Sequence, residues 1–317
     1  MSQIEVKILA DSVSLSGARL TTFELFYHRY FHSEVLTHRV ISKNAASSRA
    51  IPSSKLLEVV ENSPMLPISV GKNQAGMQAT QDLEQDLADK FINEWKALGH
   101  TVAAGVKVLQ DLGAHKQIVN RPLEAWLPIR VVATATDWDN FFELRDSKYA
   151  QPEFADLAKK MRHALAENNP TQLKVGEWHL PYVTVDDRNF VLSGMIEYVA
   201  AKYWYTLCAL SASRCARVSH AIGGLSKKDI ADEIEKGREL FAVKHMSPFE
   251  HIATPWDVAE ACHKVIATNP IGASGALDEL THWLSVPNSK CPEWADVRNL
   301  RGWRQLRSFI EYGSIEL

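Results

Sequence analysis

The ten residues 127–136, LPIRVVATAT, constrain the fold most strongly. They form an apolar run with one charge, Arg130, which has the length of a buried strand and is too short to span a membrane. Two further segments, 3–9 and 18–27, alternate in a strand-like way around a Ser/Gly turn and predict a β-hairpin. A few strands among many helical segments predict the α+β class.

Helical periodicity covers most of the remaining chain. The segment 80–99 is the clearest case, and its apolar face carries Leu83, Leu87, Phe91, Trp95 and Leu98. We expect a break at Pro152 and a capped helix start at Ser226. The predicted helices are 27–39, 80–99, 103–112, 137–166, 193–215 and 226–241. The polar stretches 42–52 and 65–79 are predicted loops.

Composition excludes several protein classes. The 317 residues carry 35 Lys plus Arg against 38 Asp plus Glu, a net charge of −3, so no bulk attraction to nucleic acid is expected. The chain start lacks a basic segment with an apolar signal core. The four cysteines, Cys208, Cys215, Cys262 and Cys291, form no Cys-x-x-Cys pair. These features predict a soluble protein of the reducing cytoplasm, without a membrane segment.

Common motifs of nucleotide and metal sites do not fit this sequence. Gly71-Lys72 is followed by Asn73, where a P-loop needs Ser or Thr, and no Gly-x-Gly-x-x-Gly is present. His28 and His32 stand four residues apart, but the residues between them include no catalytic Glu. We therefore interpret this pair as part of an aromatic helix and predict no metal site.

Three other segments carry unusual polar groups. Residues 37–49 offer cations, hydroxyls and backbone N–H groups suited to phosphate, although a solvated loop has the same composition. Residues 137–153 place Asn140 and Arg145 near one helix face, or form a charged surface helix. Residues 245–251 cluster two histidines and a serine, a pattern that is more often structural than catalytic.

Together these segments resemble one family, the flavin-dependent thymidylate synthases (ThyX). Its Arg-His-Arg hallmark is similar to Thr37-His38-Arg39…Ser42…Asn44-Ala45…Ser47…Arg49, with the spacing intact. Its Asn-Leu-Arg motif with Ala-Gln-x-Glu resembles Glu143-Leu144-Arg145…Ala150-Gln151-Pro152-Glu153. Ala216-Arg217-Val218-Ser219 and the Ser-Pro-Phe-Glu-His segment at 245–251 are similar to two more of its motifs.

The order of these motifs differs from that of the family. The last two precede the hallmark in ThyX proteins but follow it here, so the resemblance implies a circular permutation, with residues 18–39 beginning at the strand that follows Ser-Pro-Phe-Glu-His. It implies a ThyX-like α+β fold with a central antiparallel or mixed sheet and flanking helices. We expect a catalytic domain at 1–255 and a helical extension at 256–317 that packs on it.

The resemblance also assigns roles to individual residues. It implies contacts to FAD from His38, Arg39, Asn140, His245 and Ser247. It implies contacts to dUMP from Ser47, Ser48, Arg49, Arg121 and Arg145. Arg145 would lie at the uracil edge as the catalytic residue, favouring ionisation of the ring so that C5 becomes a better nucleophile.

The implied activity is reductive methylation of dUMP to dTMP. FAD, reduced by NADPH, would supply the redox chemistry, and methylenetetrahydrofolate would supply the carbon. Family members are homotetramers with sites shared between chains, so an oligomer is expected. The resemblance implies no membrane or nucleic-acid partner.

Several hallmark residues are replaced. Thr37 replaces the first Arg of the hallmark, Ala45 replaces its Glu, and Ala50 replaces a Tyr. Thr134-Ala135-Thr136 replaces an Asn-x-Arg that touches the flavin in the family. Each lost charge-assisted contact is worth roughly 1.5–3 kcal/mol. Arg29, Lys43 or Arg130 could substitute. A different C5 product, such as hydroxymethylation, and a catalytically silent nucleotide-binding protein are the alternatives.

Overall fold

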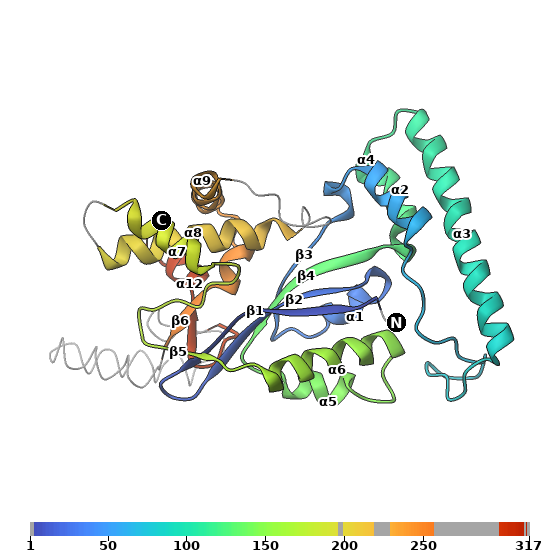
Figure 1. The fold of residues 1–317 in the computed structure, drawn as a ribbon, viewed down its shortest axis with the longest axis horizontal. Coiled ribbons are helices and arrows are strands. Elements are labelled where there is room, and N and C mark those ends of the chain that lie inside the picture. The colour runs from blue at the N-terminus through green and yellow to red at the C-terminus, as the bar shows by residue number, and fades with distance from the viewer. Residues whose placement is uncertain (1–2, 196–198, 219–228, 257–297, 314, 316–317) are drawn as a thin grey trace, which may run out of the picture.

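A computed structural model describes residues 3–195, 199–218, 229–256, 298–313 and 315. A five-stranded sheet in the order β3-β4-β2-β1-β5 runs through its centre (Figure 1). None of the described helices has both the length and the apolarity that a membrane crossing requires.

The predicted hairpin and the buried strand form the middle of the sheet. Strands β1 (Glu5–Ser14) and β2 (Arg19–His28) pair antiparallel, and β2 also pairs with β4 (Pro128–Ala135). Strand β5 (Thr171–Leu173) adds to β1 in parallel, which makes the sheet mixed. The prediction of an α+β fold with a mixed sheet and flanking helices is confirmed.

The polar segment 42–52 is not entirely a loop, and that prediction was wrong for its first residues. Ser42–Ala45 form strand β3, which pairs antiparallel with β4 at the sheet edge. Buried Ile41 and Ala46 flank the strand and anchor it. An edge strand pairs on one side only, so polar residues are tolerated there. A short 3-10 turn, η2 (Ser48–Ala50), follows.

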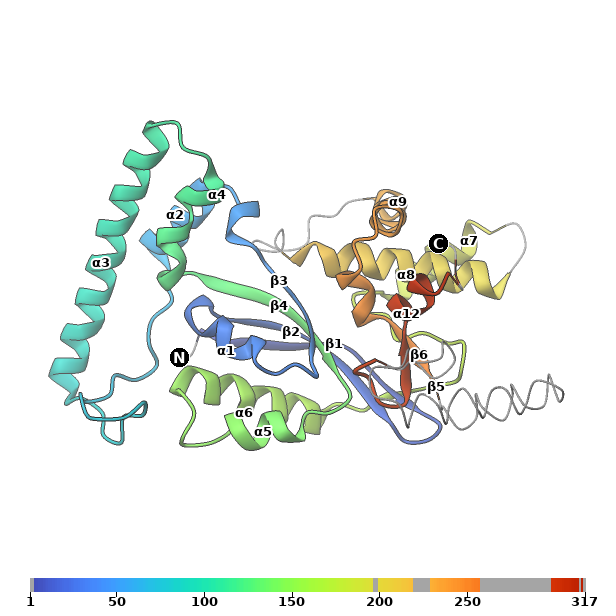
Figure 2. The same ribbon diagram turned by 180° about the vertical axis from the view of Figure 1, so that it is seen from behind.

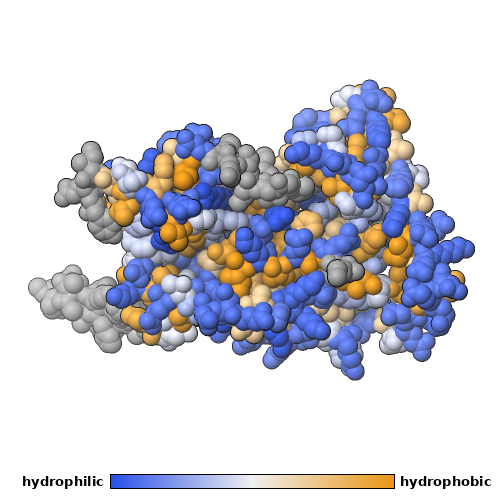
Figure 3. Space-filling view, viewed as in Figure 1, coloured by the Kyte–Doolittle hydropathy of each residue, from blue (hydrophilic) through white to orange (hydrophobic). Residues whose placement is uncertain are grey.

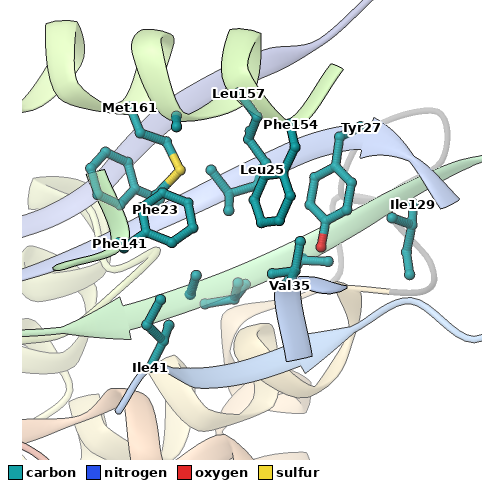
Figure 4. Close-up of a cluster of buried hydrophobic side chains, with 14 of the residues drawn as sticks. Phe23, Leu25, Tyr27, Val35, Ile41, Ile129, Phe141, Phe154, Leu157 and Met161 are labelled. Atoms are coloured by element: carbon teal, nitrogen blue, oxygen red, sulfur yellow. The ribbon is translucent and has the colours of Figure 1, made fainter. Parts of the chain in front are cut away.

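Two helices cover one face of the sheet and complete the main core. Helix α5 (Asp139–Arg145) and helix α6 (Pro152–Glu167) flank the predicted break, and Pro152 begins α6 in its first turn, where no N–H is needed. Phe154, Leu157 and Met161 of α6 lie against Phe23 and Leu25 of β2 (Figure 4). The helix predicted over 27–39 is confirmed only in its middle, which forms the 3-10 turn η1 (Arg29–Phe31) and helix α1 (His32–Leu36), whereas Tyr27 and His28 still belong to β2.

A long helix dominates one end of the molecule. The predicted helices at 80–99 and 103–112 are one continuous helix, α3 (Gln85–Asp111), beside α2 (Ser53–Asn62), α4 (Lys116–Val119) and the 3-10 turn η3 (Arg121–Trp126) (Figures 1 and 2). The predicted face is buried only in part, because Trp95 packs against the neighbouring core whereas Leu87, Phe91 and Leu98 are exposed. Apolar side chains interrupt the polar surface on this side of the molecule (Figure 3).

The other end is helical, with one small strand pair. Its helices are α7 (Val185–Ser193), α8 (Ala200–Ala216) and α9 (Ile230–Ala242), followed by the 3-10 turn η5 (Ser247–His251). Asp229 caps α9 through the N–H of Ala231, whereas the predicted start at Ser226 lies outside the described residues.

The two sides of the predicted boundary at 255/256 pair with each other. Strand β6 (Ala253–Pro255) pairs with β7 (Trp303–Gln305), which leads into α12 (Leu306–Glu311). Most of the predicted extension, 257–297, lies outside the described residues. The division into 1–255 and 256–317 therefore stays a prediction.

Helices α8 and α9 pack so closely that one glycine is required between them. A Cβ added to Gly237 would lie 2.0 Å from the carbonyl oxygen of Ala209. We expect Gly237→Ala to lower the free energy of unfolding by about 2 kcal/mol, because the helices must separate. Gly105→Ala, in open space on α3, is the matched control and should raise it by up to about 1 kcal/mol. Urea denaturation of both variants measures the difference, and equal effects would contradict the prediction.

Candidate functional site

A cavity of about 610 Å³ opens between the hallmark-like segment, the turn η5 and the described C-terminal residues. Three parts of the chain that are far apart in sequence therefore share one wall. The lining residues are Leu36, Arg39, Ile41, Ser42, Lys43, Glu250, Arg298, Asn299, Gln305 and Arg307.

Hydrogen bonds to Ser42 hold this wall together. The amide nitrogen of Asn299 donates to the Ser42 hydroxyl (3.1 Å) and to the Val40 carbonyl (2.8 Å). The amide nitrogen of Gln305 donates to the same hydroxyl (3.2 Å) and to the Glu250 carbonyl (3.1 Å). Since Gln305 and Ser42 are both buried, these bonds fix β7, β3 and η5 relative to one another.

The charge of the cavity is mainly positive. Arg307 pairs with Glu250 and with Glu311, and Arg298 also pairs with Glu311. Arg39 has no ion-pair partner within the described ranges, and Lys43 is bound through a backbone carbonyl, that of His38. Among the described residues, neither Arg39 nor Lys43 forms an ion pair, so two cations face the cavity and favour an anionic ligand.

Lys43 titrates near neutral pH. Burial lowers its pKa to about 8, against the opposing charge of Glu250. With FAD as an anionic probe, whose diphosphate keeps its charge over this range, we expect the affinity of the cavity to fall roughly tenfold between pH 7 and pH 9 as Lys43 loses its proton. Lys43→Arg should remove this fall, and Lys43→Gln should bind weakly at both pH values. Titration calorimetry measures all three, and an unchanged pH profile in Lys43→Arg would contradict the assignment.

The structure joins His38 to Arg145, two residues predicted to serve different ligands. The Nε of Arg145 donates to Nε2 of His38 at 3.0 Å, and its guanidinium carbon lies 4.5 Å from the centre of the Phe154 ring. Burial first, and then the charges of Arg145 and Lys43, lower the pKa of His38 to about 4. The imidazole is therefore neutral and accepts at Nε2. No described residue accepts a hydrogen bond from the Nη groups of Arg145, which can therefore serve a ligand.

Two of the residues predicted to contact dUMP, Ser48 and Arg121, bond to Glu124. The Ser48 hydroxyl donates to Glu124 at 2.5 Å, and Arg121 donates to the same carboxylate oxygen at 2.9 Å. Ser48 is fully buried, so its hydroxyl faces the protein interior, whereas Arg49 and Arg121 are exposed. Ser47 is half-buried at the start of η2. This group does not include Arg145, which bonds His38 instead.

Three residues predicted for the flavin do not line the cavity. Asn140 is exposed on α5, and His245 is exposed just before η5. Ser247 begins η5 and is half-buried, three residues before Glu250. Of the predicted flavin residues, the cavity therefore brings in Arg39, with His38 bonded to the neighbouring Lys43.

Two of the cations expected to substitute for the missing arginines, Arg29 and Arg130, interact with other protein groups instead. Arg29 donates to the Ala46 carbonyl (2.7 Å) and lies 3.6 Å from Glu124, and Arg130 pairs with Glu24 at 2.6 Å. Lys43 is the candidate that reaches the cavity. Sequence reasoning missed Arg298 and Arg307 as cavity residues. The available signal was an arginine at every third position, at 298, 301, 304 and 307.

Behind the cavity, a chain of buried hydrogen bonds crosses the sheet. His251 Nδ1 lies 2.8 Å from the Thr134 hydroxyl, which lies 2.7 Å from that of Thr22. Thr22 in turn lies 2.8 Å from Nε2 of His179, whose Nδ1 is 2.9 Å from the Ser12 hydroxyl. Burial lowers the pKa of both histidines to about 3, so both are neutral. Thr134, one of the replaced positions, thus holds η5 against β4.

Comparisons with known proteins give structural likenesses only. No protein-family model matches the sequence, and no curated protein matches it. The chain is similar to the UMP/dUMP methylase PolB from Streptomyces cacaoi bound with 5-Br UMP, with 15% identity and a TM-score of 0.44 over 53% of this chain and 90% of that one. It is also similar to the flavin-dependent thymidylate synthase ThyX from Helicobacter pylori complexed with FAD and dUMP, with 20% identity and a TM-score of 0.32 over 46% and 67%. At TM-scores below 0.5 we draw no conclusion about this chain from either likeness.

Proposed function

We propose that this protein modifies dUMP at C5 as a flavin-dependent thymidylate synthase. It would make dTMP with methylenetetrahydrofolate as carbon donor and NADPH as reductant. One observation carries the proposal. Residues of two ThyX-like segments, His38 and Arg145, are in contact although 107 positions separate them, and Glu250 of a third segment lines the same cationic cavity as Arg39.

The position of β6 supports the proposed circular permutation. A permuted chain needs the strand after Ser-Pro-Phe-Glu-His to end near the start of residues 18–39. Ala253 of β6 shares a buried cluster with Leu20 of β2 and with Trp303. The indole nitrogen of Trp303 also donates to the carbonyl of Ala18 at 3.1 Å. The two ends that the permutation separates in sequence are thus neighbours in space.

The residues present fit the anionic part of FAD. Arg39 and Lys43 would hold its diphosphate, because both are cations at the cavity wall that form no ion pair with a described residue. When bound, FAD would supply the redox chemistry of the reaction. Asn140, His245 and Ser247 stay proposed flavin contacts.

The nucleotide would lie between Arg145 and the Glu124 cluster. Arg145, oriented by neutral His38 and Phe154, would stabilise negative charge on the uracil ring through its remaining N–H groups. Arg49, Arg121 and Ser47 would hold the phosphate. Ser48 would contribute its backbone, since its hydroxyl is bonded to Glu124.

A different C5 product is the second candidate, and the replaced flavin position favours it. Thr134 bonds His251, and the Thr136 hydroxyl accepts from the backbone N–H of Arg301 at 3.0 Å. Both side chains are neutral and are bonded within the protein, so these two positions do not supply the cationic contact that the family has there. An altered flavin contact is compatible with an outcome such as hydroxymethylation.

We also propose a homo-oligomer, on the family pattern of a tetramer. The exposed apolar residues Leu87, Phe91 and Leu98 of α3 provide a surface that such an assembly would cover. Light scattering coupled to size-exclusion chromatography tests this proposal, and a monomer at micromolar concentration would contradict it.

An absorbance spectrum and a product assay test the function. The purified protein with FAD should show bound flavin, and labelled dUMP with NADPH and methylenetetrahydrofolate should yield dTMP. Bound flavin with another C5-modified nucleotide would select the second candidate. Absence of flavin binding and of any turnover would overturn the enzyme proposal, leaving the silent nucleotide-binding protein.

A further inference from the structure

A second cavity, of about 480 Å³, lies among the turn at 175–178, the first turns of α8 and helix α12. It shares no lining residue with the cavity at Ser42. Its volume is within the range of small-molecule sites. Aromatic side chains dominate its walls, namely Trp178, Trp204, Tyr205, Trp256 and Phe309.

The planes of these aromatic rings are steeply inclined to one another, and the rings line the sides of the cavity. The ring centres of Trp178 and Phe309 are 5.5 Å apart at an interplanar angle of 62°, and those of Trp178 and Tyr205 are 6.5 Å apart at 72°. The guanidinium carbon of Arg304 lies 3.9 Å from the Phe309 ring centre and supports that wall. Such walls offer π surfaces to a flat apolar body.

The carboxylate of Glu177 is held at the edge of this cavity. Gly176 adopts a φ of +87°, which a glycine accommodates without strain, and its N–H donates to the Thr254 hydroxyl at 2.9 Å. The turn then lets the N–H of Lys174 bond Oε2 of Glu177 at 2.8 Å. No described residue bonds Oε1 of Glu177. A fixed acceptor therefore borders an aromatic cavity.

The size of the cavity decides between two kinds of ligand. Aromatic walls with a carboxylate also suit a compact cation such as a quaternary ammonium. That group would fill only a small part of about 480 Å³, and Arg304 already occupies the faces of Phe309 and Trp256. A flat ring system with N–H groups along one edge uses both the walls and the carboxylate.

We propose that this cavity binds a flat heteroaromatic ring that carries a 2-amino-4-oxo pyrimidine edge. The adjacent ring N–H and amino group of that edge donate together to a carboxylate, here Glu177. Pterins and guanine share this chemistry. The proposal does not depend on the activity at the first cavity, because no residue is shared between the two.

Binding of two probes to the full chain, without flavin or dUMP, tests the site and distinguishes a pterin ligand from a guanine ligand. Folic acid carries the edge on a pterin, and GMP carries it on a purine. The matched controls are p-aminobenzoylglutamate, which is the folate tail alone, and IMP, which lacks the amino group. We expect calorimetry to detect folic acid, GMP or both, and to detect neither control at the same concentrations.

Two variants locate the binding. Glu177→Gln should weaken it at least tenfold, since one of two acceptor interactions becomes repulsive. Trp204→Leu should weaken it through lost stacking, and circular dichroism checks that the variant folds. Glu143→Gln, an exposed carboxylate on α5, should leave it unchanged. Absence of binding by both probes, equal binding of the controls, or an unchanged affinity in Glu177→Gln would overturn the proposal.

Discussion

Replacing Arg145 by Ala should lower turnover of dUMP by about two to three orders of magnitude and raise the pKa of His38. The first effect follows if Arg145 is the preorganised cation at the uracil edge, because such groups contribute mainly to the transition state. The second effect is independent of catalysis. The charge of Arg145 is one of the causes that lower the pKa of His38 to about 4, and its loss also admits water to the imidazole.

Arg162→Ala is the matched control. Like Arg145, Arg162 lies over an aromatic ring: its guanidinium carbon is 5.2 Å from the centre of the Phe142 ring, and it pairs with Asp146. The two variants lose the same group, but only Arg145 bonds His38. Histidine resonances followed by NMR between pH 3.5 and 7.5 report the pKa, and Arg145→Lys tests whether charge alone suffices. An Arg145→Ala enzyme of ordinary activity would contradict the catalytic role, and an unmoved His38 pKa would contradict the contact.

The parts of the fold that local pattern determines could be predicted from the sequence. The hairpin at the N-terminus, the strand at 128–135 and the start of α6 at Pro152 each depend on alternation, an apolar run or a proline. Strand β3 could not be found in the same way. Its residues are polar, and they become a strand because β4 offers a free edge beside them.

The buried face of α3 shows a second limit of local pattern. Large apolar residues mark the predicted face, yet the structure buries Gly99, Ala103 and Val106 instead. A Cβ on Gly99 would lie only 3.0 Å from the Trp126 indole, so small residues are what allow the helix to approach. A prediction from hydrophobicity does not select glycine as a contact residue, and for this reason the contact face was predicted correctly only at Trp95.

For the candidate site, resemblance identified residues but not their contacts. His38 and Arg145 are 107 positions apart, and only the pairing of β2 with β4 and the packing of α5 bring them together. Arg298, Asn299 and Arg307 belong to no motif, so their place in the cavity depends on β7 pairing with β6. The arginines at 298, 301, 304 and 307 are regularly spaced, but this spacing does not say which part of the fold they face.

The second large effect is a loss of stability in mild acid. His179 and His251 are fully buried, and burial lowers the pKa of each to about 3 from an ordinary value near 6.5. The unfolded chain therefore binds two more protons than the native protein between these values, and stability must fall as pH decreases below 6.5. At pH 5 the loss is about 2 kcal/mol for each histidine, a large share of the 5–15 kcal/mol typical of whole proteins.

Urea unfolding at pH 7.5, 6.5, 5.5 and 5.0 measures this loss, and one variant assigns it. Below pH 6.5 the free energy of unfolding should fall steeply, with His32 and His38 adding in the same direction because their pKa values are lowered to about 4. His179→Gln keeps a polar side chain between Ser12 and Thr22 but cannot titrate. It should lower the slope by about 1.4 kcal/mol per pH unit, which corresponds to one proton. His163→Gln, at an exposed site beside Glu167, controls for the loss of a histidine outside the core. Equal slopes in the native protein and His179→Gln would show that His179 is protonated in the folded state, and the neutral hydrogen-bond chain across the sheet would then be wrong.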